Sequence, residues 1–201
     1  MPDTIAPKAA LGAERLRPRG IRLSERSGLG KIDLRGDPGD RTFMTAVGRC
    51  LDMLLPGEAN TMASKGDATA LWLGPDEWLI TCTRSDVPRL AASLREALDS
   101  VHAAVTDVSD GRVALRLSGP SVREVLAKGC PLDLHPRAFK AGGVAQSLLA
   151  KASVLIHLVQ DEPQGGPTCD LYVGRSFAHY VFAWLEDAGR EYGVQIDGTQ
   201  V

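Results

Sequence analysis

Apolar and polar residues alternate over short stretches in the first half of the chain, which predicts strands, and recur at helical spacing between those stretches. Residues 31–34 alternate like a half-buried strand, and residues 43–51 place an apolar side chain at every fourth position, as one face of a helix does. Two apolar segments, 70–73 and 78–82, flank Gly74-Pro75-Asp76-Glu77, a turn sequence that favours a hairpin. A second helix is predicted next, and its apolar face consists of Val87, Leu90, Ala91, Leu94, Ala97 and Leu98.

The same order of elements recurs in the second half. Residues 113–117 alternate like a strand, Gly119 and Pro120 turn the chain, and residues 122–126 predict a short helix. Leu171-Tyr172-Val173-Gly174 repeats the pattern of Leu71-Trp72-Leu73-Gly74. A last helix is predicted with an apolar face formed by Phe177, Tyr180, Val181, Trp184, Leu185 and Ala188.

These repeats predict an α+β fold made of duplicated strand–helix–hairpin–helix modules. The expected divisions are an Arg-rich N-terminal arm (1–30), a first α/β module (31–104), a second α/β module (105–193) and a C-terminal tail (194–201). Helices packed on one face of an antiparallel or mixed sheet suit such modules.

The composition is that of an ordinary globular chain, with 44% hydrophobic and 24% charged residues among 201. No apolar stretch approaches the roughly 20 residues of a bilayer span, so we expect no contact with a membrane. The first residues lack the apolar run of a secretion signal, which favours the cytoplasm. No two cysteines lie within four residues of each other, so we expect reduced, mostly buried thiols, with a disulfide framework as the less favoured alternative. The cysteines are Cys50, Cys82, Cys130 and Cys169.

Positive charge is concentrated at the start of the chain. Residues 1–31 carry seven Lys or Arg against three acidic residues, while the other 170 residues carry 16 against 22. The segment shows little apolar periodicity, so we interpret it as an arm that docks onto a protein partner; a solvated leader is the alternative. Nucleic acid is disfavoured as a partner because the remainder is acidic and poor in aromatic residues. The docking residues that we predict are Arg15, Arg17, Arg19, Arg22 and Arg26.

The standard catalytic motifs are absent from the sequence. Gly28-Leu29-Gly30-Lys31 has the glycines of a phosphate loop, but Ile32 stands where a Ser or Thr is required. The four histidines show no paired metal-ligand spacing, and no serine lies in a GxSxG elbow. Two pairs of carboxylates, at 107 and 110 and at 161 and 162, could do acid–base work, although turn formation is the commoner role of such residues. We therefore expect no catalytic residue and no metal site in this chain.

Several segments carry a resemblance to a known family. The stretch 105–112, followed by Leu115–Pro120, resembles the aminomethyltransferase (T-protein) folate-binding superfamily, and residues 30–193 as a whole resemble the gamma subunits of heterotetrameric sarcosine oxidase. The further segments that carry the resemblance are 71–79, 129–134, 145–150 and 175–178. The resemblance implies a T-protein-like folate-binding fold.

The resemblance also implies partners and cofactors. These oxidases contain alpha, beta, gamma and delta subunits and convert sarcosine, oxygen and tetrahydrofolate to glycine, hydrogen peroxide and methylenetetrahydrofolate. FAD, FMN, NAD, zinc and tetrahydrofolate are then expected in other subunits and none in this chain, while the gamma subunit helps to hold the complex together.

One segment departs from the aminomethyltransferase pattern. Those enzymes carry an acidic pair after a Gly-Gly step, whereas this chain has Gly142-Gly143-Val144-Ala145-Gln146-Ser147. Gln146 and Ser147 form hydrogen bonds but do not act as an ionised base. We therefore expect a non-catalytic structural subunit. The alternatives are a stand-alone folate-dependent one-carbon transferase or tRNA-modification factor, and a folate-binding module that serves the oxidase without catalysis.

Overall fold

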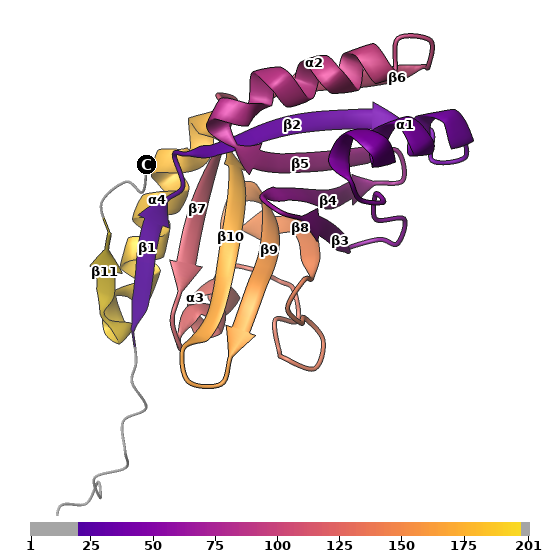
Figure 1. The fold of residues 1–201 in the computed structure, drawn as a ribbon. Coiled ribbons are helices and arrows are strands. Elements are labelled where there is room, and N and C mark those ends of the chain that lie inside the picture. The colour runs from indigo at the N-terminus through magenta and orange to yellow at the C-terminus, as the bar shows by residue number, and fades with distance from the viewer. Residues whose placement is uncertain (1–19, 198–201) are drawn as a thin grey trace, which may run out of the picture.

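Two β-sheets pack face to face in the computed structural model, which describes residues 20–197, and two helices cover the outer face of each sheet (Figure 1). The five-stranded sheet is antiparallel, with the order β3 (Met62–Lys65), β4 (Ala68–Gly74), β5 (Glu77–Thr83), β2 (Leu29–Gly36) and β6 (Ala103–Asp107). The six-stranded sheet has the order β11 (Val194–Ile196), β1 (Ile21–Glu25), β7 (Arg112–Ser118), β10 (Gly166–Gly174), β9 (Ala152–Glu162) and β8 (Val144–Leu149). Only its β1–β11 pair, among the described strands, is parallel.

Separate hydrophobic clusters hold the four layers together. Helices α1 (Arg41–Leu51) and α2 (Val87–Ala97) pack on the five-stranded sheet, where the rings of Phe43 and Trp78 lie 5.8 Å apart between centroids. Helices α3 (Val122–Ala127) and α4 (Arg175–Gly189) cover the six-stranded sheet. A smaller cluster, which includes Leu79, Leu155 and Tyr172, fills the space between the two sheets. Burying large apolar side chains contributes about 1.5–3 kcal/mol for each before the entropy of ordering is counted.

The predicted α+β class is confirmed, but each half contains one more strand than the sequence predicted. The chain runs strand, helix, three strands and helix in β2–α1–β3–β4–β5–α2, and again in β7–α3–β8–β9–β10–α4. Each half therefore carries a three-stranded meander in place of a hairpin. Leu71–Gly74 lies in the middle strand of the first meander, whereas Leu171–Gly174 ends the last strand of the second, so the two segments are not equivalent.

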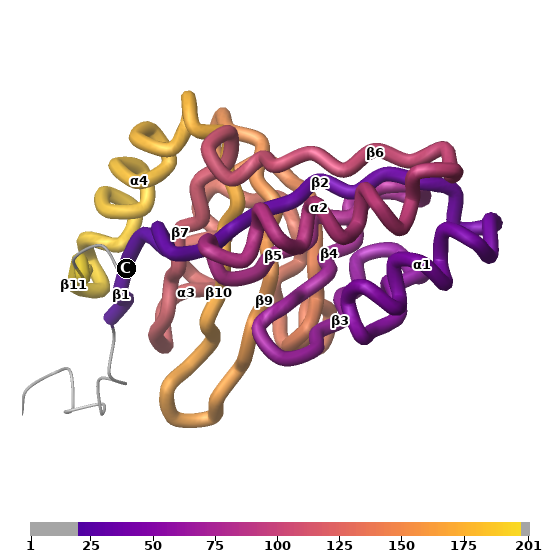
Figure 2. Tube along the Cα trace, turned by 45° about the horizontal axis from the view of Figure 1, so that its top comes forward, coloured from indigo at the N-terminus to yellow at the C-terminus, as the bar shows by residue number. Residues whose placement is uncertain are grey.

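The N-terminal segment 20–30 is part of the core and not an arm. Strand β1 lies between β7 and β11, at the end of the molecule opposite α1 (Figures 1 and 2). Ile21 is 2% exposed and Leu23 is fully buried. The prediction was wrong here because a five-residue strand with two inward apolar residues gives too short a pattern to be recognised. The predicted tail also begins with a strand, since Val194 pairs with Ile21.

Helix α4 turns a slightly different face inward from the one predicted. Val181 and Leu185 are fully buried, and Trp184 is half-buried against Gly129. Phe177 and Tyr180 are 49% and 39% exposed, so the inward assignment of these two residues was wrong.

All four thiols are unpaired in the structure, and three of them are buried, as predicted, while Cys50 is half-buried. Within residues 20–197, no helix combines the length and the apolar character that crossing a bilayer requires.

Candidate functional site

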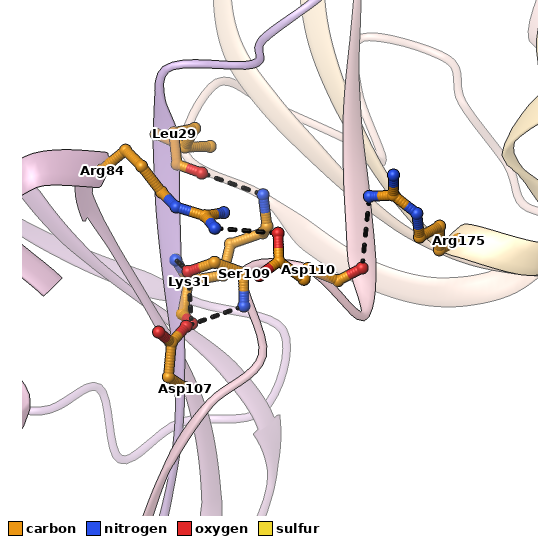
Figure 3. Close-up of polar contacts among 7 residues, drawn as sticks. All are labelled: Leu29, Lys31, Arg84, Asp107, Ser109, Asp110 and Arg175. Atoms are coloured by element: carbon orange, nitrogen blue, oxygen red, sulfur yellow. Dashed lines mark hydrogen bonds and ion pairs between the residues drawn. The ribbon is translucent and has the colours of Figure 1, made fainter.

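The segment 105–112 forms the connection between the two halves, from the end of β6 to the start of β7. Asp107 Oδ1 accepts a hydrogen bond from the backbone N of Ser109 at 2.9 Å, which closes a tight turn. Ser109 Oγ accepts from the backbone N of Lys31 at 2.9 Å and donates to the Lys31 carbonyl at 3.2 Å (Figure 3). The hydrogen bonds from Ser109 lower the pKa of Asp107. Asp107 thus shapes the loop, and Ser109 holds it onto β2.

Charged groups surround this loop. Lys31 is buried, and its Nζ donates to the Leu29 carbonyl at 2.9 Å. Burial, followed by the charge of Arg84, lowers the pKa of Lys31. Arg84, in the short 3-10 helix η1 (Arg84–Asp86), donates to Asp110 Oδ1 at 2.8 Å. Arg175, the first residue of α4, donates to the Asp110 carbonyl at 3.5 Å. Figure 3 shows these side chains converging from separate elements.

A pocket of about 270 Å³ lies among these groups, and we call it the basic pocket. Two carboxylates, those of Glu25 and Asp110, also line it. Its cationic lining residues are Arg26, Lys31, Arg84, Arg112 and Arg175. The pocket combines β1, β2, β7, η1 and α4, so no local sequence signal marks it. Arg112 and Arg175 lie in segments that carry the family resemblance, but their convergence was not predicted.

A buried ion cluster adjoins the basic pocket on the six-stranded sheet. Asp170 is 1% exposed and accepts from Arg26 Nη1 at 2.8 Å and from Arg116 Nε and Nη2 at 2.7 and 2.8 Å. The bond to Asp170 raises the pKa of Arg116. His157, the register partner of Asp170 on β9, is buried, and neither of its ring nitrogens has a hydrogen-bond partner. Burial lowers the pKa of His157.

The glycine pair and the residues after it lie at the start of β8. Gly142 has φ +82°, a backbone conformation that favours glycine. Gln146 Nε2 donates to the Leu73 carbonyl at 2.6 Å and so links the two sheets. Ser147 lies 3.7 Å from the thiol of Cys130. These residues do not fit the one-carbon chemistry of folate, because no carboxylate lies in 142–147 and the Gln146 amide is committed to a structural bond.

Of the second pair of carboxylates that the sequence singled out, Asp161 has a structural partner. Asp161 pairs with Arg123 Nη2 at 2.6 Å, and the same guanidinium donates to the Leu134 and Phe139 carbonyls. The exposed Glu162 lies at the end of β9, in the hairpin with β10. Among residues 20–197, no group of three His, Cys, Asp or Glu side chains is arranged to hold a metal ion.

The predicted docking arginines fall in different settings. Arg22 lies exposed on β1, while Arg26 is engaged with Asp170 inside the chain. Arg15, Arg17 and Arg19 lie outside the described residues. Of the two that the structure describes, Arg26 lines the basic pocket and Arg22 does not.

Comparison with known proteins assigns a family to this architecture. The family model described as "Sarcosine oxidase, gamma subunit family" matches residues 35–191. The sarcosine oxidase subunit gamma of Corynebacterium sp. (strain P-1) is 34% identical over 173 residues, which is 86% of this chain and 81% of that protein. The corresponding subunit of Arthrobacter sp. is 34% identical over 163 residues, 81% of this chain and 76% of that protein.

Solved structures agree with the sequence relatives. A chain of the heterotetrameric sarcosine oxidase from Corynebacterium sp. U-96 in complex with pyrrole 2-carboxylate matches with a TM-score of 0.77 and 32% identity, over 86% of this chain and 85% of that chain. The glycine cleavage system aminomethyltransferase T of Bartonella henselae matches with a TM-score of 0.63 at 14% identity, over 92% of this chain and 49% of that chain, which shows a shared fold. The chain belongs to the sarcosine oxidase gamma subunit family.

Proposed function

We propose that this chain is the non-catalytic gamma subunit of a heterotetrameric, flavin-dependent sarcosine oxidase. The observation that carries the proposal is its likeness, over more than four fifths of its length, to a chain of such an oxidase. The oxidase converts sarcosine, oxygen and tetrahydrofolate to glycine, hydrogen peroxide and methylenetetrahydrofolate. This chain contributes structure to the complex and no reacting group.

The engagement of its acidic residues supports a non-catalytic role. A general base needs an accessible, ionisable group within reach of substrate. Asp107 holds a turn, Asp161 is bound to Arg123, and Asp170 is buried between two arginines. The position where relatives with transferase activity are expected to carry carboxylates holds Gln146 and Ser147 instead.

The proposal places the partners and cofactors around this chain. The alpha, beta and delta subunits assemble with it in the cytoplasm and hold FAD, FMN, NAD, zinc and tetrahydrofolate. Arg15, Arg17, Arg19 and Arg22 contribute to docking, whereas Arg26 serves the internal ion cluster. Obligate subunits commonly bury more than about 2,000 Å² at their interfaces, so the partners should cover a large part of the surface.

Co-purification tests the proposal. The tagged full chain, produced together with the three partner subunits, should bring down a flavin-containing complex whose absorption shows bound flavin. The isolated chain should show no heat signal on titration with reduced folate. A chain that stays alone in the presence of the partners contradicts the subunit assignment, and tight folate binding by the isolated chain favours the one-carbon transferase class.

A shorter chain tests the docking arginines. Removal of residues 1–19 leaves β1 in place, whereas removal of 1–26 would take β1, which lies between β11 and β7, from the six-stranded sheet. The 20–201 chain should fold but assemble more weakly, and its assembly should depend less on salt, because fewer charges contribute. Arg22→Gln in the full chain should act in the same direction. Unchanged assembly in both variants contradicts the docking role.

A further inference from the structure

The lining of the basic pocket carries more positive than negative side chains. Five cationic side chains line it, against the carboxylates of Glu25 and Asp110. Asp170 adjoins the pocket, but it already serves both Arg26 and Arg116. The Asp110 side chain is 84% exposed and already pairs with Arg84, so its charge is shared between Arg84 and Lys31.

The floor of the pocket brings like charges together. Lys31 is 3% exposed, and burial and the charge of Arg84 disfavour its charged form, against opposing effects of Asp110, Glu25 and Asp107. One hydrogen bond, to the Leu29 carbonyl, is formed by an ammonium that has three donors. A buried cation is unfavourable unless it is paired, so this arrangement favours an anion as a further partner.

Two guanidinium groups at the rim retain most of their donors. Within residues 20–197, no hydrogen bond or salt bridge engages the Arg112 guanidinium, although its charge acts on the nearby Asp33 carboxylate, and Arg175 makes one long bond to the Asp110 carbonyl. Each guanidinium has five N–H donors in a planar fork that matches the two oxygens of a phosphate or a carboxylate. The backbone N of Arg175 bonds to the Gly111 carbonyl at 2.9 Å, which fixes the start of α4 beside Arg112 at the start of β7.

We propose that the basic pocket binds one oxyanion, a phosphate or a carboxylate, through Arg112 and Arg175 at the rim, with Arg84 and Lys31 supplying further positive charge. Sites for drug-sized ligands span about 300–1,000 Å³, so a pocket of about 270 Å³ suits a single oxyanion group better than a folate or a nucleotide. Because the lining comes from both halves of the chain, the bound anion joins them electrostatically.

The anion has two possible sources with the same chemistry. It comes from solution as free phosphate, or a partner subunit presents it as a carboxylate. The second source rests on the proposed function, whereas the first does not.

Titration of the full chain with inorganic phosphate tests the proposal. Calorimetry at constant ionic strength, with sodium chloride as the reference, should show saturable binding to one site, and phosphate should raise the melting temperature. Arg112→Gln and Arg175→Gln should each weaken binding at least tenfold. Arg49→Gln is the matched control, because Arg49 lies exposed in the last turn of α1 and outside the pocket lining; it should bind like the parent chain.

Folding of each variant is checked by near-UV circular dichroism, and Arg175→Lys supplies a second test at the rim. Lys keeps the charge but lacks the planar fork, so binding should fall between that of the parent chain and that of Arg175→Gln. The proposal is overturned if the parent chain does not bind phosphate, or if the Gln variants at 112 and 175 bind phosphate as tightly as Arg49→Gln.

The same titration on the assembled complex identifies the source. Loss of phosphate binding on assembly, together with weaker assembly of Arg112→Gln, indicates a carboxylate from a partner. Phosphate binding that persists in the complex indicates a free anion. If no complex forms, the subunit assignment fails. The phosphate titration of the chain alone still shows whether the basic pocket binds an oxyanion.

Discussion

Asp170 is the buried carboxylate that pairs with both Arg26 and Arg116 on the inter-sheet face of the six-stranded sheet. It lies on the face of β10 opposite to the apolar cluster under α3 and α4, and its carboxylate is shared by arginines from β7 and from the β1–β2 connection. A protein tolerates buried charges when they are paired and hydrogen-bonded. Removing the carboxylate would leave the two arginine charges uncompensated.

Asp170→Asn should therefore lower the free energy of unfolding by about 2–3 kcal/mol. This loss is smaller than is usual for breaking a fully buried ion pair, because both arginines are partly exposed. Urea denaturation measures the change. Asp187→Asn is the matched control: its pair with Arg190 is exposed on both sides, and its effect should stay within about 0.5 kcal/mol. Equal effects of the two substitutions would contradict the structural role of Asp170.

His157 makes the stability of the chain sensitive to acid. Burial lowers its pKa below the ordinary value of 6.5, against a smaller opposing effect of Asp170, and Arg116 and Arg26 lower it further. As the pH falls below about 6.5, the unfolded chain takes up a proton that the folded chain does not, so this residue makes the folded state less stable.

His157→Phe should therefore reduce the loss of unfolding free energy that occurs between about pH 8 and pH 5.5. The substitution also removes two buried ring nitrogens that lack hydrogen-bond partners, which are unfavourable in the folded state. Urea denaturation at both pH values gives the comparison. His102→Gln changes an exposed histidine and should leave the pH profile as it is. A profile for His157→Phe that parallels the parent chain would show that protonation of His157 is not the cause.

Gly30, one of the two glycines that resemble a phosphate loop, is required by the packing of α2 on β2. A Cβ at Gly30 would lie 2.1 Å from Val87 Cγ2 and 3.2 Å from the Cα of Arg84. The glycine therefore permits the start of α2 to pack closely on β2, and the following residue, Lys31, lies in the basic pocket. The motif has a packing role that a phosphate-loop pattern does not describe.

Gly30→Ala should destabilise the chain by about 1–3 kcal/mol, because the new methyl group forces α2 away from the sheet. Thermal unfolding of Gly57→Ala provides the control, since a Cβ at Gly57 has no atom within 4 Å. If both variants melt at the temperature of the parent chain, the close approach of β2 and α2 is not needed for stability.

The elements that the sequence predicted correctly are those with a long apolar pattern. Helices α1 and α2 repeat buried residues at spacings of three and four, so periodicity was sufficient to identify them. The edge strand β3 has no fully buried residue and β8 has two, so neither shows a continuous apolar pattern, and both were missed. The basic pocket was missed for another reason: its side chains come from five separate segments, and only the folded chain brings them together.

The whole molecule depends on contacts between its two halves. The inter-sheet cluster combines Leu71, Leu73 and Leu79 of one sheet with Val144 and Leu155 of the other. The loop that carries Ser109 is bonded to β2 of the first half, and the Gln146 side chain is bonded to β4. Neither half buries all of its apolar surface alone.

We therefore expect a single cooperative unfolding transition. Trp184→Phe leaves Trp72 and Trp78, both in the first half, as the remaining tryptophans. Their fluorescence, which reports on the first half, and far-UV circular dichroism, which reports on both, should superimpose during urea denaturation. Two separated transitions would show that the halves unfold independently.

The position of β1 between β7 and β11 has a consequence during translation. The strand leaves the ribosome first, yet its parallel neighbour is made last, from Ile21 to Val194. At roughly 5–20 residues per second, synthesis of the intervening chain takes on the order of ten to thirty seconds. Strand β7 is made about halfway through, but until the segment 189–194 is made Ile21 lacks its neighbours Gly189 and Val194, so the nascent chain leaves part of its apolar surface uncovered, where a chaperone can bind.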